Sequence, residues 1–203
     1  MSPEPKTALV VIDAQRAFVD PAGSLWRTHG EAEILPGLAA FERLRAVLRS
    51  RTHVGPTIWV RSEYTRGQFT GGDLTDGMAL VCVPGANVDC EWADGVVEAM
   101  SPHDVVVTKR HDDAWQSPEF RTAIEGAVRA GVRRVVVVGF QFTTCVVASA
   151  ISTQLALREH GVRVAVVEAL TGSRARSHLP GASGVSRMES TRRQLAAAGV
   201  DVV

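Results

Sequence analysis

Val135-Val-Val-Val138 is followed at once by Gly139-Phe-Gln-Phe-Thr-Thr-Cys145, so that four β-branched residues lead through a glycine into a cysteine. A short continuous run of this kind is typical of a parallel strand that is covered on both faces. The residues that follow, 145–159, favour a helix. The sequence therefore predicts a strand–turn–helix unit with a thiol where the strand ends.

Short apolar runs of the same kind recur along the chain, and segments of helical length separate them. The stretches expected to form strands are residues 8–12, 57–60, 105–107, 135–138, 162–167 and 200–203. Between them, apolar residues recur every three or four positions, as in Leu38, Phe41, Leu44 and Leu48. This alternation predicts an α/β fold: a doubly wound, mostly parallel six-stranded sheet with helices on both faces, in a three-layer, Rossmann-like arrangement. Residues 1–203 are expected to form a single domain.

Length and composition narrow the possible functions. The 203 residues are 45% apolar, enough for a substantial core. Lys and Arg number 22, as do Asp and Glu, so the chain lacks the basic excess typical of nucleic-acid binding. No apolar run is long enough to cross a membrane, and residues 1–6 do not resemble a signal peptide. Three cysteines cannot all pair within one chain. We expect a cytoplasmic protein whose partner is a small-molecule substrate, not nucleic acid or a membrane.

Three chemically complementary side chains follow predicted strands. Asp13 follows the first strand, Lys109 the third and Cys145 the fourth. In a doubly wound sheet, ligands bind outside the carboxyl ends of the strands, so these groups are expected to meet there. A helix N-terminus and a nearby cation lower the pKa of a thiol and make it a nucleophile. A carboxylate can take the thiol proton and return it to a leaving group, and backbone N–H groups in residues 139–145 can bind an oxyanion.

Each of the three residues also has an ordinary structural interpretation. Free cysteines are usually packing residues, an aspartate after a strand often caps a helix, and a lysine there is usually solvated. Taken singly, each is more consistent with structure than with catalysis. Their joint placement at three strand ends favours a catalytic set.

Three motifs resemble those of the isochorismatase-like cysteine hydrolases, which include nicotinamidases and N-carbamoylsarcosine amidases. They are Asp13-Ala-Gln-Arg-Ala-Phe18, Lys109-Arg-His-Asp-Asp-Ala-Trp115, and Gly139 through Cys145-Val146. The likeness extends over residues 7–167. It implies the three-layer α/β fold, no cofactor, and assembly as a homodimer or homotetramer.

The resemblance also assigns roles to individual residues. It implies that Cys145 is the nucleophile, that Asp13 is the general base and then the acid, and that Lys109 is the charge linking them. It further implies a cis peptide bond before Gln141, with the backbone amides of Gln141 and Cys145 forming an oxyanion hole.

In this family, residues that follow the second strand line the pocket, and residues from other segments form its remaining walls. The residues expected to bind substrate here are Gln15, Phe18, Arg61, Tyr64, Phe69 and Trp115. Where the family has Ser-Ala-Phe, this chain has Asp113-Ala114-Trp115, which predicts an added negative charge and a larger ring near the pocket.

No metal is expected at the site. Nicotinamidases place a metal-binding Asp-x-His soon after the second strand, but this chain reads Arg61-Ser-Glu-Tyr-Thr-Arg66 there. Nicotinamide is therefore a disfavoured substrate. A zinc site formed by Cys82 and Cys90 with His103 and His111 does not fit known ligand spacings. The two cysteines are better interpreted as loop residues.

The leading hypothesis is a cofactor-independent cysteine amidohydrolase acting on a small amide, ureido or lactam substrate through a thioester. Two alternatives stay open: an isochorismatase-type hydrolase that cleaves a vinyl ether with the aspartate as acid, and a non-catalytic binding protein that kept the fold. Residues 171–185 are a candidate lid. The Ala-, Arg- and Val-rich composition suggests a GC-rich genome and a role in specialised metabolism.

Overall fold

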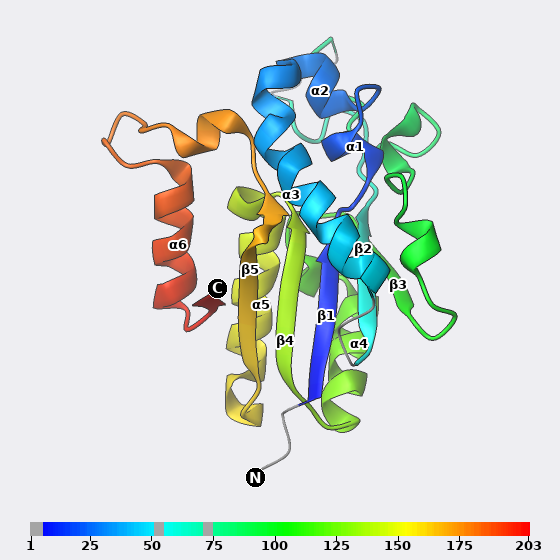
Figure 1. Cartoon of the computed structure of the whole chain (residues 1–203), viewed down its shortest axis with the longest axis vertical. Helices are drawn as coiled ribbons and strands as arrows, with labels where there is room; N and C mark the ends of the chain where they lie inside the picture. Colours follow the sequence, from blue (N-terminus) through cyan, green and yellow to red (C-terminus); the bar gives the residue numbers. More distant parts are fainter. Residues whose placement is uncertain (1–5, 51–54, 71–74) are drawn as a thin grey trace.

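A six-stranded sheet forms the centre of the molecule (Figure 1). The computed structural model describes residues 6–50, 55–70 and 75–203. The strands are β1 (Lys6–Ile12), β2 (Thr57–Ser62), β3 (Val105–Lys109), β4 (Val132–Phe140), β5 (Arg163–Gly172) and β6 (Asp201–Val202). Their order is β3-β2-β1-β4-β5-β6, and every pairing is parallel. The predicted doubly wound α/β fold is confirmed.

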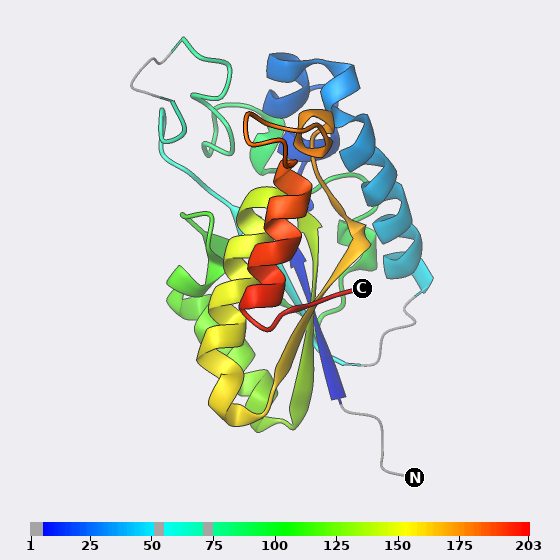
Figure 2. The same cartoon turned by 90° about the vertical axis from the view of Figure 1, so that its left-hand side faces the viewer.

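Helices cover both faces of the sheet (Figure 2). The helix α3 (Glu31–Ser50) packs on one face, and α4 (Pro118–Arg129), α5 (Val147–Leu157) and α6 (Arg187–Ala197) lie on the other. Alternate residues of β1 enter two separate hydrophobic clusters: Val10 belongs to the cluster under α4 and α5, and Val11 belongs to the cluster under α3. Continuous valine runs therefore arise because each strand is buried on both sides.

Short elements gather above the carboxyl ends of the strands. They include α1 (Arg16–Val19), α2 (Ser24–His29) and single turns of tighter helix, of which Ala114–Gln116 and Ala175–His178 are nearest the site described below. The helix expected over residues 145–159 differs at its start, because Phe142–Val146 form a wider π-helical turn and α5 begins at Val147. Wide turns of this type are frequent at functional sites. The first residues of the candidate lid, Thr171 and Gly172, belong to β5.

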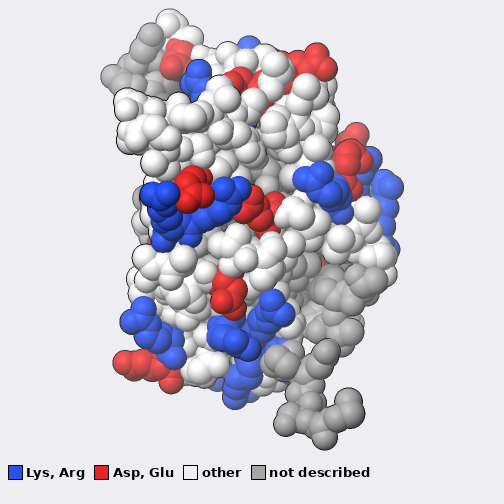
Figure 3. All heavy atoms as spheres, turned by 60° about the vertical axis from the view of Figure 1, so that its left-hand side comes forward, with Lys and Arg blue, Asp and Glu red and all other residues white. Residues whose placement is uncertain are grey.

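The outer surface over α6 mixes charges of both signs (Figure 3). Arg192 pairs with Glu168 at 2.6 Å, and Arg193 pairs with Glu189 at 3.0 Å. Among the helices of the described residues, none is long and apolar enough to cross a membrane.

Gly139 lets β4 approach β1 closely at the point where the strands end. Its φ is 113°, a conformation that favours glycine, and a Cβ atom there would overlap the backbone of Ile12. Gly139 also pairs with Ile12 in the sheet register. The glycine therefore fixes the distance between the strand that carries Asp13 and the turn that carries Cys145.

Gly139→Ala is expected to lower the free energy of unfolding by about 2 kcal/mol or more, because a side chain there meets backbone as well as an unfavourable φ. For a chain of this size that is a fall in Tm of roughly 4 °C or more, measurable by thermal denaturation followed by circular dichroism. The control is Gly161→Ala, since Gly161 has φ of 64° but nothing near its missing Cβ. Equal losses in the two variants would contradict the role assigned to the close strand contact.

Candidate active site

Three strands bring Asp13, Lys109 and Cys145 together. Asp13 follows β1, Lys109 is the last residue of β3, and Cys145 lies in the π-helical turn after β4. The Nζ atom of Lys109 is 3.0 Å from Asp13 Oδ2 and 3.3 Å from Cys145 Sγ. All three residues are buried, with Cys145 the most exposed at 4%. The structure thus places a carboxylate, an ammonium and a thiol in direct contact.

The backbone of Asp13 is held in an uncommon conformation. Its φ is 51°, a left-handed value for a residue with a side chain, and its N–H donates to the carbonyl of Val60 at 2.7 Å. Such conformations persist where the surroundings enforce them, and they cluster at functional sites. Here the turn directs the chain away from the sheet immediately after the carboxylate has been placed.

Two hydroxyl groups complete the hydrogen bonding around Lys109. Ser62 Oγ lies 2.7 Å from Lys109 Nζ and donates to Asp13 Oδ1 at 2.9 Å. Tyr64 OH lies 2.9 Å from Lys109 Nζ and 3.7 Å from Cys145 Sγ. The Tyr64 hydroxyl also lies 2.7 Å from Ser62 Oγ, so the two hydroxyl groups, the ammonium and the thiol form one connected network. Tyr64 was expected only as an aromatic wall, and Ser62 was not anticipated, although it stands at the end of β2.

The charges at the site favour a protonated thiol. Burial raises the pKa of Cys145 to about 12; Lys109 opposes this shift, and the carboxylates of Asp13 and Asp112 add to it. Burial also raises the pKa of Asp13 despite the attraction of Lys109. Burial opposes the charge on Lys109, but attraction by Asp13, Cys145 and Tyr64 outweighs it and raises the pKa of the ammonium. Burial and the two carboxylates thus oppose the lowering of the Cys145 pKa that the sequence predicted from a helix N-terminus and a nearby cation.

The added negative charge near the thiol comes from Asp112 and not from Asp113. Asp112 Oδ1 is 3.7 Å from Cys145 Sγ. Asp113 instead accepts hydrogen bonds from the backbone N–H of Trp115 at 2.9 Å and from Ser152 Oγ at 2.7 Å. The expectation for Asp113 was wrong by one residue, since this aspartate caps the turn Ala114–Gln116.

Asp112→Asn is expected to lower the pKa of the Cys145 thiol, because it removes one of the two carboxylates that disfavour the thiolate. At a fixed pH below that pKa the thiolate fraction grows, so alkylation of Cys145 by iodoacetamide should accelerate about three- to tenfold. Intact-mass analysis from neutral to alkaline pH measures the rate. The control is Asp94→Asn at an exposed position, which should leave the rate unchanged. A slower or unchanged rate for Asp112→Asn would refute this electrostatic account.

A cis peptide bond joins Phe140 to Gln141, as the resemblance implied. The carbonyl of Gln141 accepts from the N–H groups of Thr144 and Val146, both at 3.1 Å, and so closes the π-helical turn. The oxyanion-hole role of the Gln141 and Cys145 amides stays a prediction.

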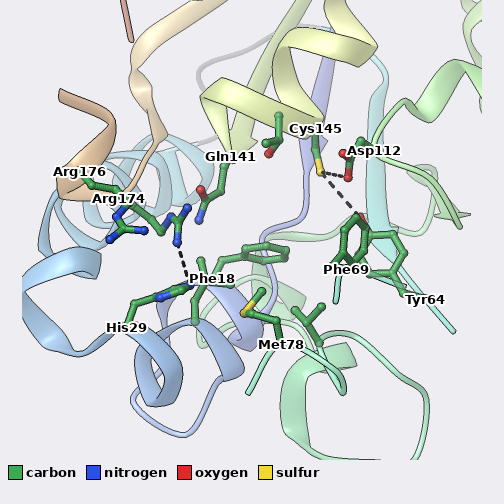
Figure 4. Close-up of a pocket in the computed structure, with 13 residues that line it drawn as sticks. Phe18, His29, Tyr64, Phe69, Met78, Asp112, Gln141, Cys145, Arg174 and Arg176 are labelled. Atoms are coloured by element: carbon green, nitrogen blue, oxygen red, sulfur yellow. Dashed lines mark hydrogen bonds between the residues drawn. The ribbon is translucent and has the colours of Figure 1, made fainter. Parts of the chain in front are cut away.

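A cavity of about 370 Å³ opens next to Cys145 (Figure 4). Its wall includes Phe18, Tyr64 and Phe69, three of the residues expected to bind substrate, and the rings of Tyr64 and Phe69 meet edge-on with centroids 4.6 Å apart. The side chain of Gln141 also borders the cavity. The thiol therefore faces a small pocket with aromatic walls.

Three other residues expected to bind substrate lie outside this cavity lining. Trp115 packs edge-on against Phe120, with ring centroids 6.1 Å apart. Gln15 is fully buried, accepting from Ser62 N at 2.6 Å and donating to the carbonyl of Ser62 at 3.1 Å. Arg61 is held by Glu63 at 2.6 Å. Each of these side chains thus has a structural role: Trp115 packs against a neighbouring ring, Gln15 supports the backbone of β2, and Arg61 forms a local ion pair.

The cavity has charged residues that sequence reasoning missed. Arg174 and Arg176 line it, together with His29 from α2. No motif marks these positions. The one available signal is that both arginines follow the end of β5, where the rule about strand ends also directs attention. The first part of residues 171–185 thus borders the pocket; lid motion stays a prediction.

The residues present do not fit a nicotinamidase-type metal centre. Among the described residues, no group of three or more His, Cys, Asp or Glu side chains is arranged to hold a metal ion. At this place the chain has Ser62, the last residue of β2, and Tyr64 just after the strand, and both are hydrogen-bonded to Lys109. Cys82 is buried, and both Cys82 and Cys90 are free thiols.

The parallel α/β sheet, with an Asp–Lys–Cys cluster at the strand ends, defines a class of cysteine-containing hydrolase. The model of the Isochorismatase domain matches residues 7–196, and the chain belongs to this family of hydrolases. No curated protein matches the sequence.

Solved structures show the same fold. An isochorismatase family protein from Desulfovibrio vulgaris has 20% identity and a TM-score of 0.65, covering 98% of this chain and 94% of that one. Pyrazinamidase of Pyrococcus horikoshii in complex with zinc has 17% identity and a TM-score of 0.68, covering 98% and 99%. A cysteine hydrolase from Pseudomonas syringae has 17% identity and a TM-score of 0.59, covering 100% and 93%. At these identities the likeness concerns the fold.

Proposed function

We propose that this hydrolase is a cofactor-independent cysteine amidohydrolase that cleaves the C–N bond of a small amide, ureido or lactam substrate. The observation that carries the proposal is the position of Lys109 Nζ, 3.3 Å from Cys145 Sγ and 3.0 Å from Asp13 Oδ2, beside the cavity. A thiol, a carboxylate and a fixed cation are the groups needed for nucleophilic attack with proton transfer.

In the first half of the reaction, Cys145 Sγ bonds to the substrate carbonyl carbon while its proton passes to Asp13. Lys109 Nζ contacts both side chains, 3.0 Å from Asp13 Oδ2 and 3.3 Å from Cys145 Sγ, and holds the carboxylate and the thiol beside each other. The carbonyl oxygen gains negative charge, for which the backbone amides of Gln141 and Cys145 are the proposed donors. Asp13 then donates the proton to the substrate nitrogen, the C–N bond breaks, and the amine leaves behind a thioester.

In the second half, water attacks the thioester. Asp13 accepts a proton from the water, the C–S bond breaks, and the sulfur takes the proton back as the acid product leaves. The raised pKa of Asp13 suits a group that must accept and release a proton in each half-reaction. Lys109 stabilises the negative charge on whichever of Asp13 and Cys145 carries it.

The experiment that tests this proposal is a screen of small amides, ureides and lactams for ammonia or amine release, followed by rapid-quench intact-mass analysis. We expect turnover of at least one class and a transient mass increase on Cys145 equal to the acyl or carbamoyl group. Turnover of vinyl ethers without any adduct would support the isochorismatase-type alternative. Complete inactivity with tight binding of a screened compound would support a non-catalytic role.

We also propose a homodimer or homotetramer, from family resemblance alone. Light scattering coupled to gel filtration measures this directly, and a monomer at micromolar concentration would contradict it.

A further inference from the structure

Positive charge gathers at one side of the cavity, apart from the thiol (Figure 4). Arg174 and Arg176 stand there beside His29, and Gln141 lies between them and Cys145. Asp112 is on the opposite side, next to the sulfur. The cavity is therefore electrically polarised, with a carboxylate at the reacting end and two guanidinium groups at the other.

The hydrogen-bond partner of Arg174 does not neutralise its charge. Arg174 Nη1 lies 2.7 Å from His29 Nε2. A guanidinium group can only donate, so His29 Nε2 must accept, and the imidazole is neutral with its proton on Nδ1. Burial and the two nearby arginines also lower the pKa of His29, consistent with a neutral ring. His29 thus orients the guanidinium and leaves its charge uncompensated.

Glu33 forms an ion pair with only one of the two arginines. Glu33 Oε2 is 3.6 Å from Arg176 Nε, and no ion pair is formed by Arg174 among the described residues. Arg174 is half-buried, and burial together with repulsion from Arg176 lowers the pKa of its guanidinium. Holding an unpaired, partly desolvated cation costs free energy, which a bound anion would offset.

We propose, resting on the amidohydrolase function, that the substrate is an amide or ureide carrying a carboxylate at the end remote from its scissile carbonyl. The carboxylate binds Arg174, whose planar group suits bidentate pairing with two oxygens, and Arg176 adds attraction. Asp112 repels the carboxylate from the sulfur, so only one orientation brings the amide carbonyl to Cys145. The cavity of about 370 Å³ limits the substrate to a small molecule.

The test uses the monoamides of dicarboxylic acids of increasing length, malonamate, succinamate, glutaramate and adipamate, each against its neutral diamide. Binding is measured by calorimetry to the Cys145→Ala protein, which cannot turn the probes over by the proposed route. We expect at least one monoamide to bind about tenfold or more tightly than its diamide, because a charge-assisted pair replaces a neutral contact.

Arg174→Gln, in the same Cys145→Ala background, should remove most of that preference and leave diamide binding unchanged. Arg176→Gln should have a smaller effect, since Glu33 already faces that side chain. Arg174→Lys keeps the positive charge and should therefore retain part of the preference. That result would show that the loss in Arg174→Gln comes from the missing charge and not from unfolding. The control is Arg129→Gln, an arginine on α4 that is 69% exposed.

The outcomes separate this inference from the proposed function. Equal affinity for monoamides and diamides, or a preference that survives Arg174→Gln, overturns the carboxylate site. Preferential binding through Arg174 without hydrolysis of any amide by the wild-type protein supports the site while the amidohydrolase function fails. Wild-type turnover of diamides as fast as monoamides supports the function and overturns the inference.

Discussion

Cys145→Ala is expected to lower kcat/KM on the amide substrate by at least about 10⁴-fold, because the nucleophile and the residues around it act as a unit. The loss should be mainly in kcat, since the pocket walls and the arginines that we propose to bind the substrate stay in place. Steady-state kinetics on the amide found by screening measures the effect, and the covalent adduct should disappear from the mass spectrum.

The matched control is Cys90→Ala, which removes a partly exposed free thiol away from the cavity lining and should leave the rate unchanged. Asp13→Asn should also abolish turnover of the amide. Full activity in Cys145→Ala would rule out the thioester mechanism. If Asp13→Asn is inactive while Cys145→Ala is active, the vinyl-ether chemistry is the better interpretation.

Lys109→Met is expected to lower the free energy of unfolding at neutral pH by about 3–5 kcal/mol, because it leaves the carboxylate of Asp13 buried without its cation. The pKa of Asp13 is already raised by burial and would rise further without Lys109. A raised pKa in the folded state costs stability above the pKa of the unfolded state. The penalty should therefore shrink as the pH falls through the folded-state pKa, because Asp13 then becomes protonated in the folded protein.

Urea denaturation at neutral and mildly acidic pH checks both the size and the sign of this effect. The double variant Asp13→Asn/Lys109→Met, which leaves no uncompensated charge at this pair, should recover much of the lost stability. The matched control is Lys6→Met, an exposed lysine at the start of β1. A deficit in Lys109→Met that does not shrink on acidification would contradict the assigned cause.

The sheet was predictable because burial on both faces leaves a direct mark on the sequence. Runs such as residues 135–138 identify strands without any knowledge of their neighbours, and the turn residues between them give the alternation with helices. The first residue of α5 was harder to predict from the sequence. A π-helical turn over Phe142–Val146 has no distinctive composition, so the expected helix began two residues too early, at residue 145.

The meeting of Asp13, Lys109 and Cys145 was predictable for a related reason. Parallel strands end at the same edge of a sheet, so residues at the ends of β1, β3 and β4 meet whatever separates them in sequence. The pocket wall could not be found this way. His29 and Arg174 are 145 residues apart in sequence and meet only because α2 and the segment after β5 pack together. The sequence also does not show which of two adjacent aspartates faces the thiol. In the structure it is Asp112, while Asp113 caps a turn.

The burial of Cys145 has a further consequence for the protein in a cell. Peroxide and related oxidants attack thiolates, and their first product at an accessible low-pKa cysteine is a sulfenic acid. Cys145 is only 4% exposed, and burial raises the pKa of its thiol, so both the access of such oxidants and the fraction of thiolate are reduced. We therefore expect the Cys145 thiol to be oxidised slowly, and this protection would follow from the same burial that raises its pKa.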